Sequence, residues 1–161
     1  MNEEVKTYVG IGVKSATAIG VGGVFVPDWP ALSVIWLSML NAIAAHYGRN
    51  LDRTQIGKIV AAVIAGAGVW MVGSGLVTKL LGWLGIFTFG GTTAVAIVVN
   101  SAINGFFTWR LGMVFDRLMC SENGANSIAE LSELIIRNMA PTPRFGEMRE
   151  FFSMYKLYRS R

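Results

Sequence analysis

Apolar residues dominate four segments of the chain, and polar residues gather between them. The segments cover residues 9–26, 31–45, 59–78 and 86–109, and the run from Leu80 to Trp109 contains no charged side chain. A helix needs about 20 mostly apolar residues to cross a bilayer, because its backbone polar groups must bond to one another once water is absent. The pattern therefore predicts an all-α, polytopic membrane protein with about four transmembrane helices.

Composition supports this class of protein. Hydrophobic residues make up 53% of the 161 residues, charged residues only 15%, and the mean hydropathy is +0.49. A soluble domain usually carries about a quarter charged residues. We expect a transmembrane helical domain over residues 1–120 and a cytoplasmic part over residues 121–161. The first residues, Met1-Asn2-Glu3-Glu4, lack the basic flank of a secretory signal.

Charge and aromatic residues predict the orientation, because Lys and Arg are retained on the cytoplasmic side of short loops and Trp and Tyr gather at the interfaces. With four crossings and both termini inside, Lys79 alone faces outward. The cytoplasmic side receives Lys6, Arg49, Arg53, Lys58, Arg110, Arg117 and the basic residues from Arg137 onward. The interfacial positions are then Tyr8, Trp29, Tyr47, Trp83 and Trp109. Without a signal peptide or a glycosylation sequon, a bacterial inner membrane is expected.

The first two segments allow a second topology. Residues 31–45 are short for a full span, so residues 9–45 could instead form a re-entrant or interfacial hairpin. Both topologies keep the two later segments as spans.

The composition changes after Cys120. Ser127 and Glu130 have capping-box spacing, and apolar residues follow at helical intervals, which predicts an amphipathic helix that ends before Pro141. The tail beyond it interleaves basic and aromatic side chains, a pattern typical of docking to an anionic leaflet or to a partner. The alternative is a tail helix packed on its own bundle. The docking candidates are Arg144, Arg149, Phe151, Phe152, Tyr155, Lys156, Tyr158 and Arg159. Nucleic acid is not expected as a partner, since no binding fold is recognisable.

Small residues recur at spacings that let helices approach closely. The helix-packing candidates are Gly12, Ala16 and Gly20 in the first segment, and Ala61, Ala65, Gly68 and Gly75 in the third. The pattern does not say whether the helices that meet belong to one copy or two.

The fourth segment carries polar residues in an apolar run. Asn100 and Asn104 are one helical turn apart, and Thr93 lies two turns earlier on that side. Burying an amide without a partner costs a few kcal/mol, so these side chains should face other helices or water. Hydrogen bonds between helices are one interpretation, and a pore or substrate lining is the other.

Residues for catalysis are not found. His46 is the only histidine, and its place at a helix end beside Tyr47 indicates an interfacial role. No catalytic set, cofactor motif or metal-ligand cluster occurs, and no carboxylate lies within a predicted span, which argues against a coupled transporter. The sequence therefore predicts neither an enzyme nor a cofactor.

Two parts of the chain resemble the membrane domain of unknown function DUF697. The first runs from Val26-Pro27-Asp28-Trp29-Pro30 through Met39 to His46-Tyr47-Gly48, and the second from Lys79 through Gly82-Trp83 to Gly90–Phe107. The resemblance covers about residues 8–118, although the proline of the second turn is missing. Many members of that family sit beside a GTPase domain. The resemblance therefore implies a membrane anchor whose nucleotide-driven partner is a separate protein.

The favoured function is a non-enzymatic membrane anchor or scaffold that assembles with itself or with a cytoplasmic protein such as a GTPase or another NTPase. The alternative is a homo-oligomeric channel or small transporter lined by Thr93, Asn100 and Asn104. A membrane-inserting toxin or its immunity partner has no direct support in the sequence.

Overall fold

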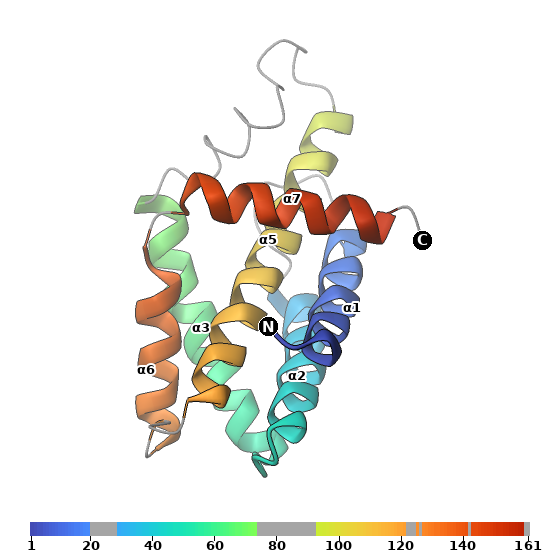
Figure 1. Cartoon of the computed structure of the whole chain (residues 1–161). Coiled ribbons are helices and arrows are strands. Elements are labelled where there is room, and N and C mark those ends of the chain that lie inside the picture. Colours follow the sequence, from blue (N-terminus) through green and yellow to red (C-terminus); the bar gives the residue numbers. More distant parts are fainter. Residues whose placement is uncertain (20–28, 74–92, 122–124, 126, 142, 160–161) are drawn as a thin grey trace.

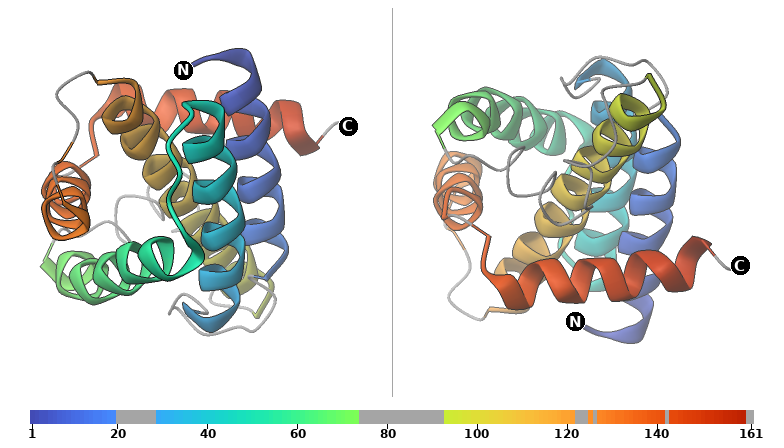
Figure 2. Two further views of the ribbon diagram at one scale, coloured as in Figure 1. Left: turned by 90° about the horizontal axis from the view of Figure 1, so that it is seen from below. Right: turned by 90° about the horizontal axis from the view of Figure 1, so that it is seen from above.

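The protein is all-α in the part that the computed structural model describes, which comprises residues 1–19, 29–73, 93–121, 125, 127–141 and 143–159. Helices α1 (Glu3–Ile19), α2 (Trp29–His46), α3 (Arg53–Gly73) and α5 (Thr93–Cys120) alternate in direction and form a bundle (Figure 1). Helix α6 (Ile128–Met139) lies along α3, and α7 (Phe145–Arg159) crosses the bundle (Figures 1 and 2).

Helices α1, α3 and α5 reach further than their apolar segments predict, and α3 begins at Arg53 rather than at residue 59. Helix α1 begins at Glu3 because the Asn2 side chain accepts a 3.0 Å hydrogen bond from the Glu4 backbone N–H, and its acidic first turn suits the helix dipole. Helix α5 continues past Trp109 to Cys120. The other parts of the predicted segments, residues 20–26, 74–78 and 86–92, lie outside the described residues.

Local capping explains where the helices begin and end. Gly48 has a φ of +66°, a left-handed conformation that glycine adopts without strain, and it ends α2. Asp52 starts α3 by accepting a 2.8 Å hydrogen bond from the Gln55 backbone N–H, and the Gln55 side chain accepts one from Asp52 in return. The predicted cap of α6 is confirmed, since the Ser127 hydroxyl accepts a hydrogen bond from the Glu130 backbone N–H.

Glycines allow α1 and α5 to pack closely. A Cβ atom on Gly105 would lie 2.5 Å from Cγ2 of Thr17, and one on Gly112 would lie 2.6 Å from Cγ2 of Val9. Both distances are far below ordinary contact, so neither site accepts a side chain unless the helices move apart.

Helices α6 and α7 belong to the same packed body as the bundle. Leu131 and Ile135 of α6 and Met148 and Phe151 of α7 are buried in one hydrophobic core with the residues of α1, α2, α3 and α5. The expected division at residue 120 therefore does not separate two cores.

One helix in the described part of the chain, α2, is long and apolar enough to cross a membrane by length and composition. The same helix also supplies Leu32, Trp36 and Leu40 to the core. The prediction of four spans is not confirmed.

Candidate functional site

The two asparagines of α5 are buried inside the bundle. Asn100 is 3% exposed and Asn104 is fully buried. The side-chain oxygen of Asn100 and both polar atoms of the Asn104 amide have no hydrogen-bond partner in the described structure. The side chain of Thr93 lies outside the description. The Asn104 amide therefore makes no hydrogen bond between helices in the described structure.

A residue that the sequence analysis missed makes the hydrogen bond between helices instead. The Trp36 indole N–H of α2 donates to the Thr108 hydroxyl of α5 at 2.9 Å, and Thr108 donates to the Asn104 backbone carbonyl at 2.8 Å. All three residues are fully buried. The available signal was that Thr108 lies one turn after Asn104, on the same face of the helix.

The predicted small-residue faces have different surroundings. In α1, a Cβ on Gly12 would lie 2.8 Å from the Met39 sulfur of α2, and Ala16 is fully buried, so this face packs within the chain. In α3, Ala61 and Ala65 are exposed. Gly66 instead meets α6, where a Cβ would lie 3.0 Å from Cγ2 of Ile136. Predicted positions outside the described side chains are Gly20, Gly68 and Gly75.

The tail helix packs on its own bundle through aromatic residues. Phe151 is fully buried, and its ring lies 5.4 Å from that of Phe106 and 5.9 Å from that of Trp109 in α5. The ring of Tyr155, also in α7, stacks on that of Phe151 with 5.8 Å between the ring centroids. Such aromatic contacts add to the stabilisation that burial gives.

The polar side of the tail helix remains at the surface. Arg144 and Arg149 are exposed, and Phe152 is half-buried. The side chains of Lys156, Tyr158 and Arg159 lie outside the description.

Arg110 and Trp109 are not surface residues, contrary to their expected places in a cytoplasmic loop and an interfacial belt. Arg110 is 3% exposed within α5, and its guanidinium donates to the Pro141 carbonyl at 2.7 Å and lies 3.9 Å from the Glu147 carboxylate. Trp109 is fully buried next to Phe151. The two residues are buried because the tail folds back over the middle of α5; their depth in a membrane stays a prediction.

Polar side chains join the ends of α1, α2 and α5. The Tyr47 hydroxyl donates to the Asp116 carboxylate at 2.7 Å, and the amino group of Met1 lies 3.9 Å from the same carboxylate. The hydrogen bond to Asp116, followed by burial, raises the pKa of Tyr47 well above its usual value near 10. A predicted interfacial residue, His46, lies 3.0 Å from the Glu4 carboxylate.

The Glu4 carboxylate also has a second partner. It accepts a 2.6 Å hydrogen bond from Tyr8, which lowers the pKa of Glu4 and raises that of Tyr8. These hydrogen bonds and ion pairs link the start of α1 to the end of α2, and the end of α2 to α5.

The two ends of the bundle differ in polarity. The C-terminal ends of α1 and α3 lie at the same end of the bundle as the N-terminal ends of α2 and α5 (Figures 1 and 2). We call this end the apolar end. The segments that connect them there, residues 20–28 and 74–92, contain Asp28 and Lys79 as their only charged residues. The opposite end, the polar end, carries the charged residues Glu3, Glu4, Arg49, Asp52, Arg53 and Arg117 among the described residues.

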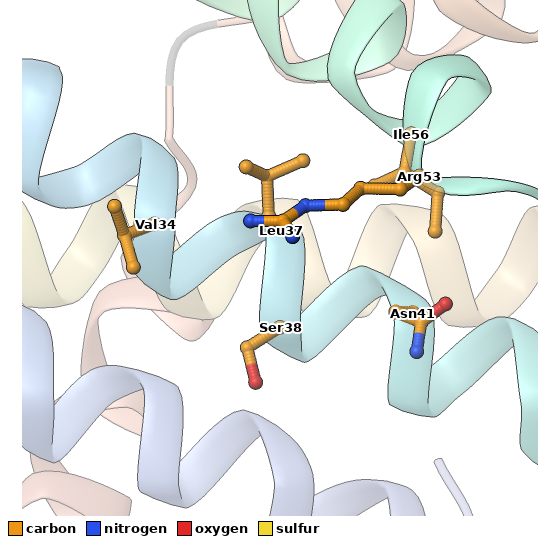
Figure 3. A pocket seen from close by; sticks show the side chains of 6 residues that line it. All are labelled: Val34, Leu37, Ser38, Asn41, Arg53 and Ile56. Atoms are coloured by element: carbon orange, nitrogen blue, oxygen red, sulfur yellow. The ribbon is translucent and has the colours of Figure 1, made fainter.

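A groove between α2 and α3 has an apolar wall and one cation. Its volume is about 330 Å³, and its lining comprises Val34, Leu37, Ser38, Asn41, Arg53 and Ile56. The Arg53 side chain extends back from the start of α3 toward Leu37 (Figure 3). Neither Asn100 nor Asn104 lines this groove or the others found in the described part of the chain.

Comparison with family models, with curated proteins and with solved structures found no match to this chain. The resemblance to DUF697 thus remains a prediction.

Proposed function

We propose that the protein is a non-enzymatic membrane anchor or scaffold whose apolar end enters the bilayer while its polar end and both termini stay in the cytoplasm. The observation that carries this proposal is the difference between the two ends of the bundle. A charged side chain in hydrocarbon costs several kcal/mol, so the end whose connecting segments contain only Asp28 and Lys79 as charged residues is the one suited to enter the bilayer.

The tail helix supports a position for the membrane boundary. Helix α7 crosses α5 about halfway along its length, with Phe151 buried against α5 and Arg149 exposed. A basic, aromatic helix that crosses a bundle is suited to lie in the interfacial plane. We therefore set the interface at the level of α7.

Helix α6 favours this depth over four complete spans. It packs on α3 at Gly66, about 20 Å along that helix from Arg53. Its outer face carries four exposed polar side chains, Glu130, Glu133, Arg137 and Asn138. In a bundle that spans the membrane completely, these side chains would face lipid. The shallower arrangement keeps them in water and leaves the start of α5 as the main inserted part of the described helices (Figure 1).

The partner is proposed on less direct grounds. The resemblance to DUF697 favours a cytoplasmic NTPase, which would meet the polar end. Exposed Ala61 and Ala65 offer a close-packing face to a second copy. The channel alternative is not favoured, because the asparagines on which it depends line none of the described grooves.

Membrane extraction tests the proposal. The chain, expressed in a bacterial host, should stay in the membrane pellet after a sodium carbonate wash. The depth is tested with Ala61→Cys in a Cys120→Ser background: a water-soluble maleimide added to inside-out vesicles should label this cysteine. Release by carbonate would refute insertion, and protection of residue 61 would favour four complete spans.

A further inference from the structure

We propose that α7 binds the anionic phospholipids of the cytoplasmic leaflet through one flank, the basic flank, which carries Phe145 and Arg149 and faces the apolar end of the bundle. This inference depends on the proposed insertion of the apolar end. Two of the aromatic residues expected to dock, Phe151 and Tyr155, do not belong to this flank, because Phe151 packs on α5 and Tyr155 stacks on Phe151.

The basic flank lies at the surface. The Phe145 side chain is 69% exposed, and Arg149, one helical turn later, is exposed as well. Both positions are rotated away from Phe151, whose fully buried ring holds α7 on the bundle. The opposite flank of the helix, the acidic flank, carries Glu147 and Glu150.

Two contacts define the rotation of α7 about its own axis. The Phe151 ring points inward and meets Phe106 of α5. The Glu147 carboxylate lies 3.9 Å from Arg110, which is one helical turn closer than Phe106 to the polar end of α5. Successive residues are about 100° apart around a helix, so the two residues of the basic flank lie about 160° from Glu147. The acidic flank therefore faces the polar end, and the basic flank faces the apolar end.

The path of α7 gives the same rotation independently. The helix lies in front of α5 and runs from the side of α6 to the side of α1 (Figures 1 and 2). In a right-handed helix that runs in this direction with Phe151 turned toward α5, position 145 is turned toward the apolar end. The ion pair and the handedness of the helix thus agree.

The basic flank reaches the leaflet at the proposed depth. Helix α7 lies closer to the apolar end than α6 does, so it is nearer to the bilayer than the exposed polar face of α6 (Figure 1). The head-group layer on each side of a bilayer is about 5 to 8 Å thick, and a helix with its side chains has a radius of about 5 to 6 Å. A helix at the hydrocarbon boundary can therefore place Phe145 at the acyl chains and Arg149 beside the phosphates.

Charge favours an anionic leaflet over the other possible occupants. The sequence from residue 144 onward contains the basic residues Arg144, Arg149, Lys156, Arg159 and Arg161 and the acidic residues Glu147 and Glu150. Each Lys or Arg near an anionic surface contributes about 1 kcal/mol, and a guanidinium has N–H donors in a geometry that matches phosphate. A second copy of this chain in a symmetric dimer would bring the same basic flank against itself.

Cysteine labelling in nanodiscs of mixed phosphatidylglycerol and phosphatidylcholine tests which flank meets lipid. Phe145→Cys and Glu150→Cys, each in a Cys120→Ser background, are exposed to a water-soluble maleimide. Their rates are divided by the rates of the same variants unfolded in urea, which removes differences in intrinsic reactivity. Glu150→Cys should then react several-fold faster than Phe145→Cys, because both positions are exposed in the protein and only residue 145 is covered by lipid. Equal rates would overturn the proposal.

Native mass spectrometry of the delipidated full chain in mild detergent tests the choice of head group. The wild type should retain phosphatidylglycerol more strongly than phosphatidylcholine. Arg149→Gln should weaken the binding of phosphatidylglycerol by about fivefold, which corresponds to the contribution of one cation near an anionic surface. Arg137→Gln, which removes an exposed cation of α6, is the matched control and should leave binding unchanged. Equal retention of the two lipids, or equal effects of the two variants, would overturn the proposal.

The remaining outcomes separate this inference from the proposed function. A dimer that protects Phe145→Cys without lipid would assign the basic flank to a second copy and overturn the lipid contact. Release of the chain by carbonate would refute the insertion of the apolar end. If the chain stays in the membrane while Phe145→Cys and Glu150→Cys are labelled equally, only the lipid contact of α7 fails.

Discussion

The hydroxyl of Tyr47, just after α2, donates a 2.7 Å hydrogen bond to the carboxylate of Asp116 in α5. This contact joins two helix ends that are distant in the sequence, and Asp116 is only 5% exposed. It lies at the polar end, where the structure is held by side-chain hydrogen bonds as well as by apolar packing.

Tyr47→Phe should lower the thermal stability of the protein. The variant leaves the buried Asp116 carboxylate without its hydroxyl donor, which costs about 1 to 3 kcal/mol. Circular dichroism of the protein in detergent should show the lower melting temperature. Tyr8→Phe, which removes an exposed hydrogen bond to Glu4, is the control and should change the melting temperature less. Equal melting temperatures for wild type and Tyr47→Phe would contradict the assignment.

The same variant predicts a pH dependence. The pKa of Tyr47 is raised in the folded protein, so its contribution to stability is complete below the unfolded pKa, near 10, and is lost as the pH rises toward the folded value. The difference in melting temperature between wild type and Tyr47→Phe should therefore shrink as the pH rises from about 9 to about 11, a range that brackets the ordinary tyrosine pKa. A constant difference would show that Tyr47 does not titrate differently in the two states.

Asn104→Leu should leave the protein as stable as the wild type or make it more stable, by up to about 2 kcal/mol. Its amide is buried with both polar atoms lacking a partner in the described structure, so a leucine of similar size removes the desolvation cost. Thr108→Val is the contrasting variant: it leaves the Trp36 indole N–H without an acceptor and should destabilise. Chemical unfolding measures both. A strong loss of stability in Asn104→Leu would contradict this prediction. It would indicate that the amide has a hydrogen-bond partner, such as water in a pore.

Gly105→Ala should destabilise the packing of α1 on α5 by about 1 to 3 kcal/mol, as overpacking does. The new methyl group would lie 2.5 Å from Cγ2 of Thr17. Gly57→Ala is the matched control, since a Cβ there meets nothing within 4 Å. Because alanine favours helix, the control should raise stability by about 0.5 to 1 kcal/mol. Melting temperatures that shift in the same direction for both variants would contradict this account of the interface.

Phe151→Ala should release α7 from the bundle. The ring is fully buried between α5 and Tyr155, and truncating a buried phenylalanine costs about 3 to 5 kcal/mol. Limited proteolysis should then cut after Arg144 or Arg149 faster than in the wild type. Phe145→Ala, at a ring that is 69% exposed, should be cut at the wild-type rate. Resistance of Phe151→Ala to the protease would mean that other contacts hold α7.

Local features of this fold could be predicted from the sequence, and contacts between distant segments could not. The Ser127 cap depends on residues close to it in the sequence, so its sequence pattern was sufficient. The burial of Trp109 and Arg110 depends on Phe151 and Pro141, which lie far along the chain. Hydropathy and charge predict an interfacial position for Trp109 and a cytoplasmic position for Arg110, because they contain no information about the segment that folds back over these residues.

The small-residue faces show the same limit. Spacing identified Gly12, whose close approach to Met39 is seen in the structure, but it did not identify Gly105 or Gly66. A glycine is needed where two helices approach, and spacing within one helix does not tell where the other helix passes.

The central claim is that the apolar end of the bundle lies in the bilayer and the polar end in water. Ala18 and Ala45 are both exposed, and they lie at the apolar end of α1 and at the polar end of α2, respectively. The most direct test measures how fast a water-soluble maleimide labels Ala18→Cys and Ala45→Cys, each in a Cys120→Ser background, in inside-out membrane vesicles. The account predicts rapid labelling at residue 45 and protection at residue 18. Equal labelling of the two, or faster labelling at residue 18, would contradict it.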